Sequence, residues 1–268
     1  MLPYNTSSMK IFRRLPGGTM AANYDDIYTG GSSRLAVEGL IGLRYRLPKY
    51  ISLLEGRYAN AGPLDILEIG AGVGEISRML RSGPVRIKRY VATEYSYPAV
   101  VHLKNEGLQC AQVSAEELPF ADNSFDLVFC VDVMHHVANP QRMAHEIVRV
   151  TRKHFFLCEA NGVSPVRRLV ELTPLAKSLG ERSYLPGRYR SFFPEGQVGE
   201  IKMRPFYVLV PPKVPGRLIP WVAALSEVGE RVPGVRWIGQ SLLIAGQKQS
   251  SCSAGRLRGR LPNDGNLT

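Results

Sequence analysis

Short apolar runs alternate along this 268-residue chain with segments whose apolar residues recur at helical spacing. Expected strands cover residues 64–69, 88–94, 109–114, 125–131 and 154–157, and helices are expected over 75–81, over 98–106 and from Asn139-Pro140. The continuous apolar run FDLVFCV is typical of a strand that a parallel sheet buries on both faces. Strict alternation of strand and helix predicts an α/β fold with a doubly wound, mostly parallel sheet.

The segments on either side of this pattern are less regular. Before this pattern, residues 36–54 predict two helices divided at Pro48. After Asn161 we expect, in order, a helix over 165–179, an irregular stretch over 184–194, a strand over 202–210, a helix over 218–228 and a strand over 237–245. These add an N-terminal helical segment and bring the sheet to seven strands. We therefore expect one domain over 24–248, between a flexible tail over 1–23 and a disordered tail over 249–268. Within the domain, residues 64–161 form the cofactor-binding core and residues 162–235 an insert or lid.

The turn after the first core strand carries the clearest chemical signal. Three alternate glycines, Gly70, Gly72 and Gly74, separate the strand from the helix that opens at Glu75. Glycine permits unusual backbone angles and close approach, and a helix N-terminus presents unpaired N–H groups. A tight turn without a ligand needs only one glycine, so this turn predicts a bound ligand.

The ends of the other strands suggest what the ligand contains. In a doubly wound sheet ligands bind at the carboxyl ends of the strands, which gathers the glycine turn, Glu94, Ser114-Ala115 and Val131-Asp132. Glu94 lies about 20 residues beyond the glycines, where an acid accepts hydrogen bonds from ribose hydroxyls. A nicotinamide cofactor and S-adenosylmethionine both suit this arrangement.

Three features favour the sulfonium cofactor. The glycines follow G-x-G-x-G and not the G-x-G-x-x-G spacing of pyrophosphate-binding turns. Glu68, two residues before the first glycine, suits an ammonium or sulfonium better than a phosphate. Residues 66–150 are slightly acidic, with 8 Lys and Arg against 10 Asp and Glu.

Longer phrases carry a family resemblance. LEIGAGVG over 67–74, AEELPFADNSFD over 115–126 and HHV over 135–137 resemble class I S-adenosylmethionine-dependent methyltransferases, in the small-molecule and lipid subgroup with the type 11 domain. The resemblance runs from about Leu64 to Asn161. It implies a Rossmann-like methyltransferase fold with a final antiparallel strand around 241–245. In that family the loop matching Gly70, Gly72 and Gly74 approaches the methionine part, the acid matching Glu94 holds the ribose, and the pair matching Ser114-Ala115 lies against adenine. With the residues at the strand ends, the predicted cofactor-binding set is Glu68, Gly70, Ala71, Gly72, Gly74, Glu94, Tyr95, Ser114, Ala115, Val131 and Asp132.

Two positions depart from the family pattern. Ser114 stands where the family often has an Asp that accepts a hydrogen bond from the adenine amino group. A serine makes that contact more weakly. Thr151-Arg152-Lys153-His154 replaces a Gly-Gly before the fifth strand, which changes loop geometry away from the cofactor.

Two adjacent histidines are the candidates for catalysis. Methyl transfer is an in-line displacement, and a hydroxyl acceptor needs a general base. His135 and His136 follow the fourth strand at the mouth of the expected site. The alternative is that the pair belongs to the family's structural pattern and makes packing or backbone contacts.

The acceptor is expected to contact the N-terminal helices and the insert. Tyr184, Tyr189, Phe192, Phe193 and Trp221 lie there among Arg182, Arg188 and Arg190, and residues 151–268 carry 18 Lys and Arg against 8 Asp and Glu. Aromatic walls with arginines suit a small-molecule or lipid-like acceptor and a peripheral contact with an anionic membrane. The alternative is a lid that packs on the sheet and leaves its arginines in solvent.

Composition excludes several other classes. Cys110, Cys130, Cys158 and Cys252 form no CxxC pair, so the sequence predicts no metal site and fits a cytoplasmic protein. No Lys/Arg run is typical of a nucleic-acid-binding tail, and neither a signal peptide nor a membrane span is expected. Two other functions stay open: a methyltransferase-like binding protein without activity and, with less support, an NAD(P)-dependent oxidoreductase.

Overall fold

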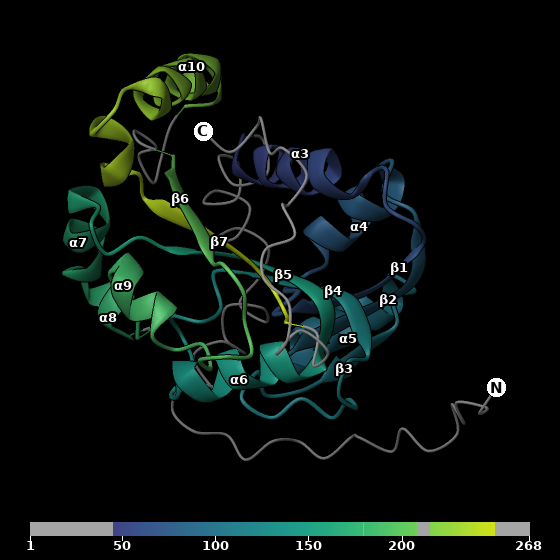
Figure 1. The fold of residues 1–268 in the computed structure, drawn as a ribbon. Coiled ribbons are helices and arrows are strands. Elements are labelled where there is room, and N and C mark those ends of the chain that lie inside the picture. The colour runs from purple at the N-terminus through teal and green to yellow at the C-terminus, as the bar shows by residue number, and fades with distance from the viewer. Residues whose placement is uncertain (1–44, 179, 208–214, 250–268) are drawn as a thin grey trace.

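The computed structural model describes residues 45–178, 180–207 and 215–249 (Figure 1). The expected N-terminal tail, the helix expected from Ala36, the end of the strand expected over 202–210 and all but Gln249 of the expected C-terminal tail lie outside these residues. The expected domain boundaries stay predictions.

Seven strands of the described chain form one sheet in the order β3-β2-β1-β4-β5-β7-β6. Their bounds are β1 Leu64–Ile69, β2 Ile87–Glu94, β3 Cys110–Gln112, β4 Phe125–Val131, β5 Thr151–Ala160, β6 Lys202–Phe206 and β7 Ser241–Gln247. Strands β1 to β5 pair in parallel, whereas β7 pairs antiparallel with both β5 and β6. The predicted α/β class, the mostly parallel seven-stranded sheet and the final antiparallel strand are confirmed.

The helices follow the strands along the chain. Their bounds are α3 Leu47–Tyr58, α4 Glu75–Ser82, α5 Tyr97–Asn105, α6 Pro140–Val150, α7 Pro165–Glu171, α8 Pro174–Ser178, α9 Pro186–Arg190 and α10 Ile219–Arg231, with 3-10 turns η3 Gly216–Leu218 and η4 Val235–Ile238. Helix α6 begins as its sequence predicts, because the Asn139 side chain accepts a hydrogen bond from the N–H of Arg142 and Pro140 takes the first position. Helices α7, α8 and α9 lie together at the β6–β7 end of the sheet (Figure 1).

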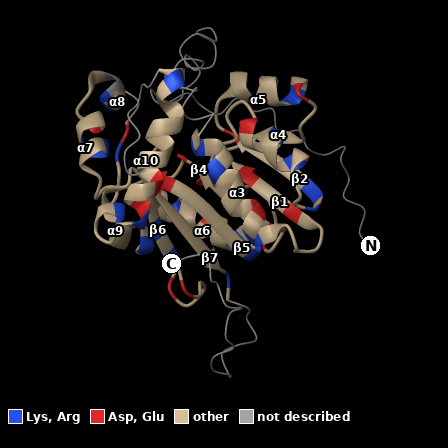
Figure 2. Cartoon of the chain, turned by 90° about the horizontal axis from the view of Figure 1, so that it is seen from above, with Lys and Arg blue, Asp and Glu red and all other residues tan. Residues whose placement is uncertain are grey.

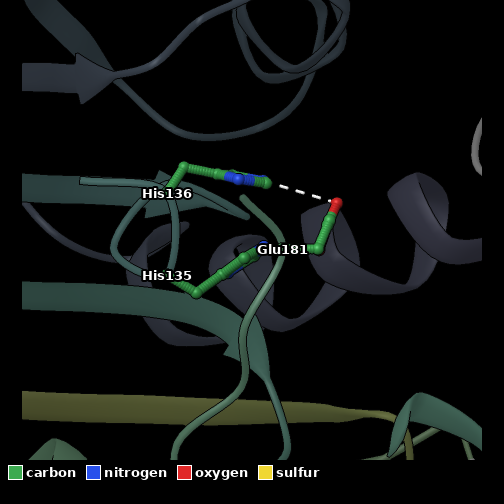
Figure 3. Close-up of side chains that lie close together, drawn as sticks. All are labelled: His135, His136 and Glu181. Carbon is green, nitrogen blue, oxygen red and sulfur yellow. Dashed lines mark ion pairs between the residues drawn. The ribbon is translucent and has the colours of Figure 1, made fainter. Parts of the chain in front are cut away.

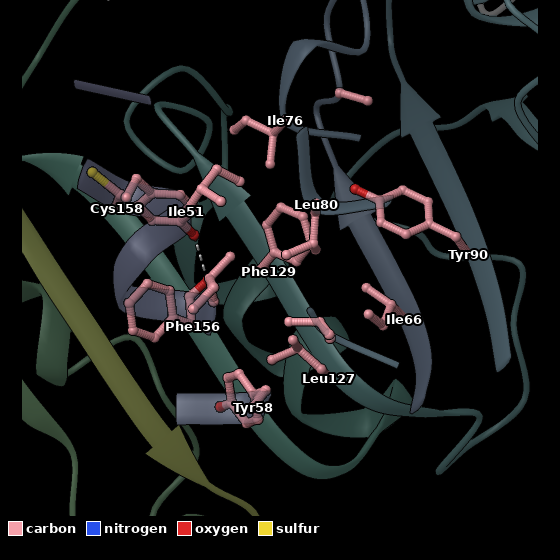
Figure 4. Close-up of a cluster of buried hydrophobic side chains, with 14 of the residues drawn as sticks. Ile51, Tyr58, Ile66, Ile76, Leu80, Tyr90, Leu127, Phe129, Phe156 and Cys158 are labelled. Carbon is pink, nitrogen blue, oxygen red and sulfur yellow. Dashed lines mark hydrogen bonds between the residues drawn. The ribbon is translucent and has the colours of Figure 1, made fainter. Parts of the chain in front are cut away.

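The sheet is buried on both faces. Along β4, Leu127 and Phe129 join one hydrophobic core and Val128 and Cys130 the other, as the two-residue period of a strand requires. Side chains of α3, α4 and α5 fill the first core, part of which is drawn in Figure 4. Helix α6 and the segment around α9 fill the second. Two-sided burial is the physical reason for the continuous apolar runs in the sequence.

One difference between the insert and the sequence prediction concerns a helix. The helix expected over 165–179 is divided into α7 and α8, because Pro174 has no N–H to continue α7. The Thr173 hydroxyl then accepts a hydrogen bond from the Ala176 N–H at 3.2 Å and caps α8.

The stretch expected to be irregular over 184–194 contains α9 and packs on the sheet. Tyr189, Phe192 and Phe193 are buried, and Phe193 stacks on Phe155 of β5 with ring centroids 4.8 Å apart. These aromatic side chains form part of the core and do not line an open acceptor wall.

None of the helices in the described ranges has the length and the apolar content that crossing a lipid bilayer requires.

Candidate functional site

The glycine turn after β1 has the backbone that its sequence predicts. Gly70, Gly72 and Gly74 have φ angles of +70°, +55° and +80°, in the left-handed region that favours glycine. A Cβ at Gly70 would lie 2.4 Å from Cγ2 of Val133, which follows β4. The turn therefore lies directly against the loop after β4, and at Gly70 only glycine fits.

Glu94 at the end of β2 is joined to this turn. Its Oε2 accepts a hydrogen bond from the Gly72 N–H at 2.9 Å, and its Oε1 accepts from the N–H groups of Tyr95 and Ser96 at 2.7 and 3.1 Å. Three N–H groups thus hold one carboxylate at the carboxyl edge of the sheet. The structure brings the predicted residues Gly72, Glu94 and Tyr95 together.

The segment after β3 lies beside them. Val113 donates its N–H to the Glu94 carbonyl at 3.0 Å, and the Gln112 side chain donates to the Tyr95 carbonyl at 3.0 Å. Ser114 and Ala115 follow and are half-buried. The Ser114 hydroxyl accepts a hydrogen bond from the Glu116 N–H at 3.2 Å, which orders the loop.

Glu68 occupies a different place from the other predicted residues. It is 2% exposed and accepts hydrogen bonds from the hydroxyls of Ser77 and, at 2.6 Å, Tyr90. Burial raises the pKa of Glu68 to about 7, against the opposing effect of these two hydrogen bonds. The carboxyl group thereby joins β1 to α4 and β2.

Val131 is the last residue of β4, and Asp132 follows it at the same edge of the sheet. Asp132 has a φ of +55°, a conformation that costs a non-glycine residue energy and that the surroundings must hold. Its carboxylate pairs with the Arg46 guanidinium at 3.0 Å, and Arg46 also donates to the Ser241 hydroxyl at 3.3 Å. The N-terminal helical segment is thereby tied to the ends of β4 and β7.

His135 is fixed by a carboxylate from the neighbouring strand. Glu159, which is fully buried near the end of β5, lies with its Oε2 2.7 Å from His135 Nδ1 and accepts hydrogen bonds from the backbone N–H groups of Val133, Met134 and His135. Burial would lower the pKa of His135, but hydrogen bonds to Glu159 and Glu181 raise it to about 9. The two carboxylates therefore favour the protonated form of His135.

His136 lies beside His135 with the opposite tendency. Their ring centroids are 4.1 Å apart, and burial together with the charge of His135 lowers the pKa of His136 to about 4. Glu181 reaches both rings from the insert, with its oxygens 3.5 Å from His135 Nε2 and 3.6 Å from His136 Nε2 (Figure 3). Arg167 of α7 also donates to Glu181.

Sequence reasoning missed four of these residues. Glu159 had a signal, because an acid near the carboxyl end of a parallel strand belongs to the ligand-binding edge. Arg46, Arg167 and Glu181 had none, because each reaches the site from a segment whose position the local pattern does not specify.

Comparisons with known proteins agree with this geometry. Residues 67–157 match the family model described as a methyltransferase domain. Over 91 residues, 32% of this chain and 34% of the relative, the chain is 37% identical to an uncharacterized methyltransferase-like protein of Schizosaccharomyces pombe. The chain thus covers about a third of the length of that relative.

Solved structures share the fold over most of the chain. A SAM-dependent methyltransferase of Thermotoga maritima is similar with a TM-score of 0.62 and 17% identity, over 86% of this chain and all of that one. Magnesium protoporphyrin IX methyltransferase of Synechocystis PCC 6803, solved with bound SAM, is similar with a TM-score of 0.55 and 10% identity, over 87% of this chain and 98% of that one. At these identities the likeness concerns the fold.

Proposed function

We propose that this chain is a class I S-adenosylmethionine-dependent methyltransferase, which transfers a methyl group from S-adenosylmethionine to an acceptor; the match of residues 67–157 to a methyltransferase domain and the shared fold support this. The observation that carries the proposal is the hydrogen bond from the Gly72 N–H to Glu94. It joins the left-handed glycine turn to the acid at the end of the adjacent strand, at the edge where doubly wound sheets bind adenosine-containing ligands.

Each predicted residue has a role in the proposed cofactor site. Glu94 accepts hydrogen bonds from the ribose hydroxyls, and Tyr95 follows it at the same edge. The methionine part lies against Gly70, Ala71, Gly72 and Gly74 and reaches Val131 and Asp132. Adenine lies against Ser114 and Ala115. Glu68 ties β1 to α4 and β2, and its carboxyl group adds negative potential for a cationic ligand when ionised.

The reaction itself is an in-line displacement in which the acceptor atom attacks the methyl carbon and S-adenosylhomocysteine leaves. Alignment of the two reactants supplies up to roughly 7–11 kcal/mol of the barrier. For a hydroxyl acceptor, His136 is the better of the two proposed bases, because a base must be unprotonated and the carboxylates of Glu159 and Glu181 favour the protonated form of His135. His135 then acts as a positioning residue.

We propose a lipid-like acceptor and a peripheral contact with an anionic membrane. Support comes from an exposed apolar stripe on α10, whose mostly uncharged length appears in Figure 2. Trp221 is 75% exposed, and Leu225 and Val228 follow on the same face at helical spacing. The exposed Arg217 and Arg231 lie at the two ends of this stripe and complement anionic headgroups. The free thiols of Cys110, Cys130 and Cys158 support the cytoplasmic location.

Calorimetry with S-adenosylmethionine, S-adenosylhomocysteine and NAD⁺ tests the cofactor. We expect the first two to bind and NAD⁺ not to bind; tighter binding of NAD⁺ would contradict the proposal. Turnover of methyl-labelled cofactor on an acceptor panel that includes lipids tests the activity. Cofactor binding without transfer to any acceptor would favour the alternative of an inactive binding protein.

Unchanged turnover of His135→Ala and His136→Ala, with cofactor affinity intact, would remove both histidines from the mechanism.

A further inference from the structure

We propose that His135 and His136, through their Nε2 atoms, and Glu181, through its carboxylate, bind a divalent transition-metal ion of the zinc type. The ligand atoms of these three side chains all lie within 4.8 Å of one another (Figure 3). Two imidazole nitrogens and one carboxylate oxygen form the ligand set of many catalytic zinc sites. The sequence shows no metal-ligand spacing for this set, because Glu181 is far from the two histidines along the chain.

The two distances from the Glu181 carboxylate to the imidazoles suit a tetrahedral ion. Ligand bonds of 2.0–2.2 Å place neighbouring ligand atoms about 3.4 Å apart at tetrahedral angles. The Glu181 oxygens lie 3.5 Å from His135 Nε2 and 3.6 Å from His136 Nε2. Small rotations of these side chains therefore bring all three groups to one centre.

The surroundings of His135 are those of a metal ligand. A metal-binding histidine usually donates its second ring N–H to a carboxylate, which fixes the ring and its tautomer. Glu159 takes this role toward Nδ1 at 2.7 Å, and hydrogen bonds from three backbone N–H groups hold Glu159 itself in place. His135 Nε2 consequently faces Glu181.

The Arg167 guanidinium competes with the proposed metal ion for Glu181 and His135. Its Nη2 donates to Glu181 and lies 3.3 Å from His135 Nε2, so the guanidinium already meets these ligands with a positive charge. Metal binding therefore displaces the guanidinium from Glu181 and from His135 Nε2. The Arg167 side chain is partly exposed at 20%, which gives it room to withdraw.

The position of the proposed metal site suggests that the ion takes part in methyl transfer, and this inference rests on the proposed function. The two histidines follow β4, next to the proposed methionine end of the cofactor. Three protein ligands leave a fourth position for an oxygen of the acceptor. A bound cation lowers the pKa of a hydroxyl, which then loses its proton to solvent and attacks the methyl carbon as an alkoxide. With His136 bound to the ion, this route needs no side-chain base. The acceptor class is then a metal-coordinating hydroxyl compound.

Calorimetry of the full chain with Zn²⁺, and the visible absorption of Co²⁺ in the same site, test the proposal. We expect His136→Ala and Glu181→Gln to lower the Zn²⁺ affinity by more than the roughly 10- to 100-fold cost of second-shell changes. Arg167→Met should raise the affinity, because it removes the competing charge. His145→Ala, an exposed histidine on α6, is the control and should bind as the parent does.

The opposite results would overturn the proposal. If these residues form only an ion-pair network, neither the parent nor Arg167→Met binds Zn²⁺ below millimolar concentration, and Co²⁺ shows no tetrahedral spectrum. Binding that survives in both His136→Ala and Glu181→Gln would place the ion elsewhere. Thermal unfolding verifies that each variant is folded. S-adenosylmethionine affinity, measured separately, shows whether the proposed function fails independently of the metal.

Discussion

The backbone N–H of Gly72 donates a hydrogen bond to the Glu94 carboxylate at 2.9 Å. This contact joins the turn after β1 to the end of β2, and the two strands are neighbours in the sheet. The same carboxylate also accepts from Tyr95 and Ser96, so its direction is set before any ligand binds. Such pre-organisation lowers the cost of ordering the site on binding.

Replacing this carboxylate should weaken cofactor binding. In Glu94→Gln the amide presents an N–H₂ group toward backbone donors and loses the charge, so we expect S-adenosylmethionine affinity to fall. Hydrogen bonds to a charged group contribute about 1.5–3 kcal/mol, which corresponds to roughly 10- to 100-fold in affinity. Calorimetry measures the change. Glu106→Gln, at an exposed acid beyond α5, is the control, and equal affinity in both variants would show that Glu94 does not contact the cofactor.

A comparison of Gly70 in the glycine turn with Gly107, which follows α5, separates the cost of backbone strain from the cost of steric overlap. Gly107 has a φ of +72° with open space around it, so Gly107→Ala should cost only the left-handed penalty of about 1–2 kcal/mol. Gly70→Ala adds the overlap with Val133 and should cost about 1–3 kcal/mol more. Denaturant unfolding measures both.

Gly62→Ala, with open space and no left-handed φ, should be neutral. The double variant Gly70→Ala/Val133→Ala should recover only part of the loss in Gly70→Ala. Equal costs at Gly70 and Gly107 would contradict the close approach of the turn to the loop after β4.

Glu68 should make stability depend on pH. Its pKa is raised from 4.5 to about 7 in the folded state, so the folded protein binds the proton more tightly than the unfolded chain. The free energy of unfolding therefore falls as the pH rises from about 4.5 to 7, by up to about 3 kcal/mol. Glu68→Gln removes this pH-dependent contribution, so the variant should be more stable than the parent protein at pH 8 and similarly stable at pH 4.5. Parallel unfolding curves for the two proteins at every pH would contradict the prediction.

The α10 stripe should bind anionic vesicles. The chain has two tryptophans, Trp221 and Trp237, and both are exposed near this surface, so their fluorescence reports binding directly. We expect a blue shift with vesicles containing phosphatidylglycerol, a weaker one with pure phosphatidylcholine, and a decrease with added salt. Leu225→Glu should abolish the shift, whereas Leu169→Glu, at an exposed leucine on α7, should not. No shift with either vesicle at low salt would exclude this surface as a membrane contact.

Local signals explain why most of the fold could be predicted. The two-residue and 3.6-residue periods, the capping by Asn139 and the alternate glycines all act within a few positions of the chain. They determined the order of strands and helices, the left-handed turn over 70–74 and the edge at which the predicted cofactor residues meet. The resemblance of the core to methyltransferases rests on the same short phrases.

Only the tertiary structure decided which distant side chains meet. It buried Glu68, packed Tyr189 and its neighbours into the core, and brought Glu181 to the two histidines. These outcomes depend on the path of the insert back over the sheet, and long-range packing sets that path where no periodic pattern is present. A sequence pattern specifies the face and order of an element, whereas the partner of a single side chain follows only once all elements are packed.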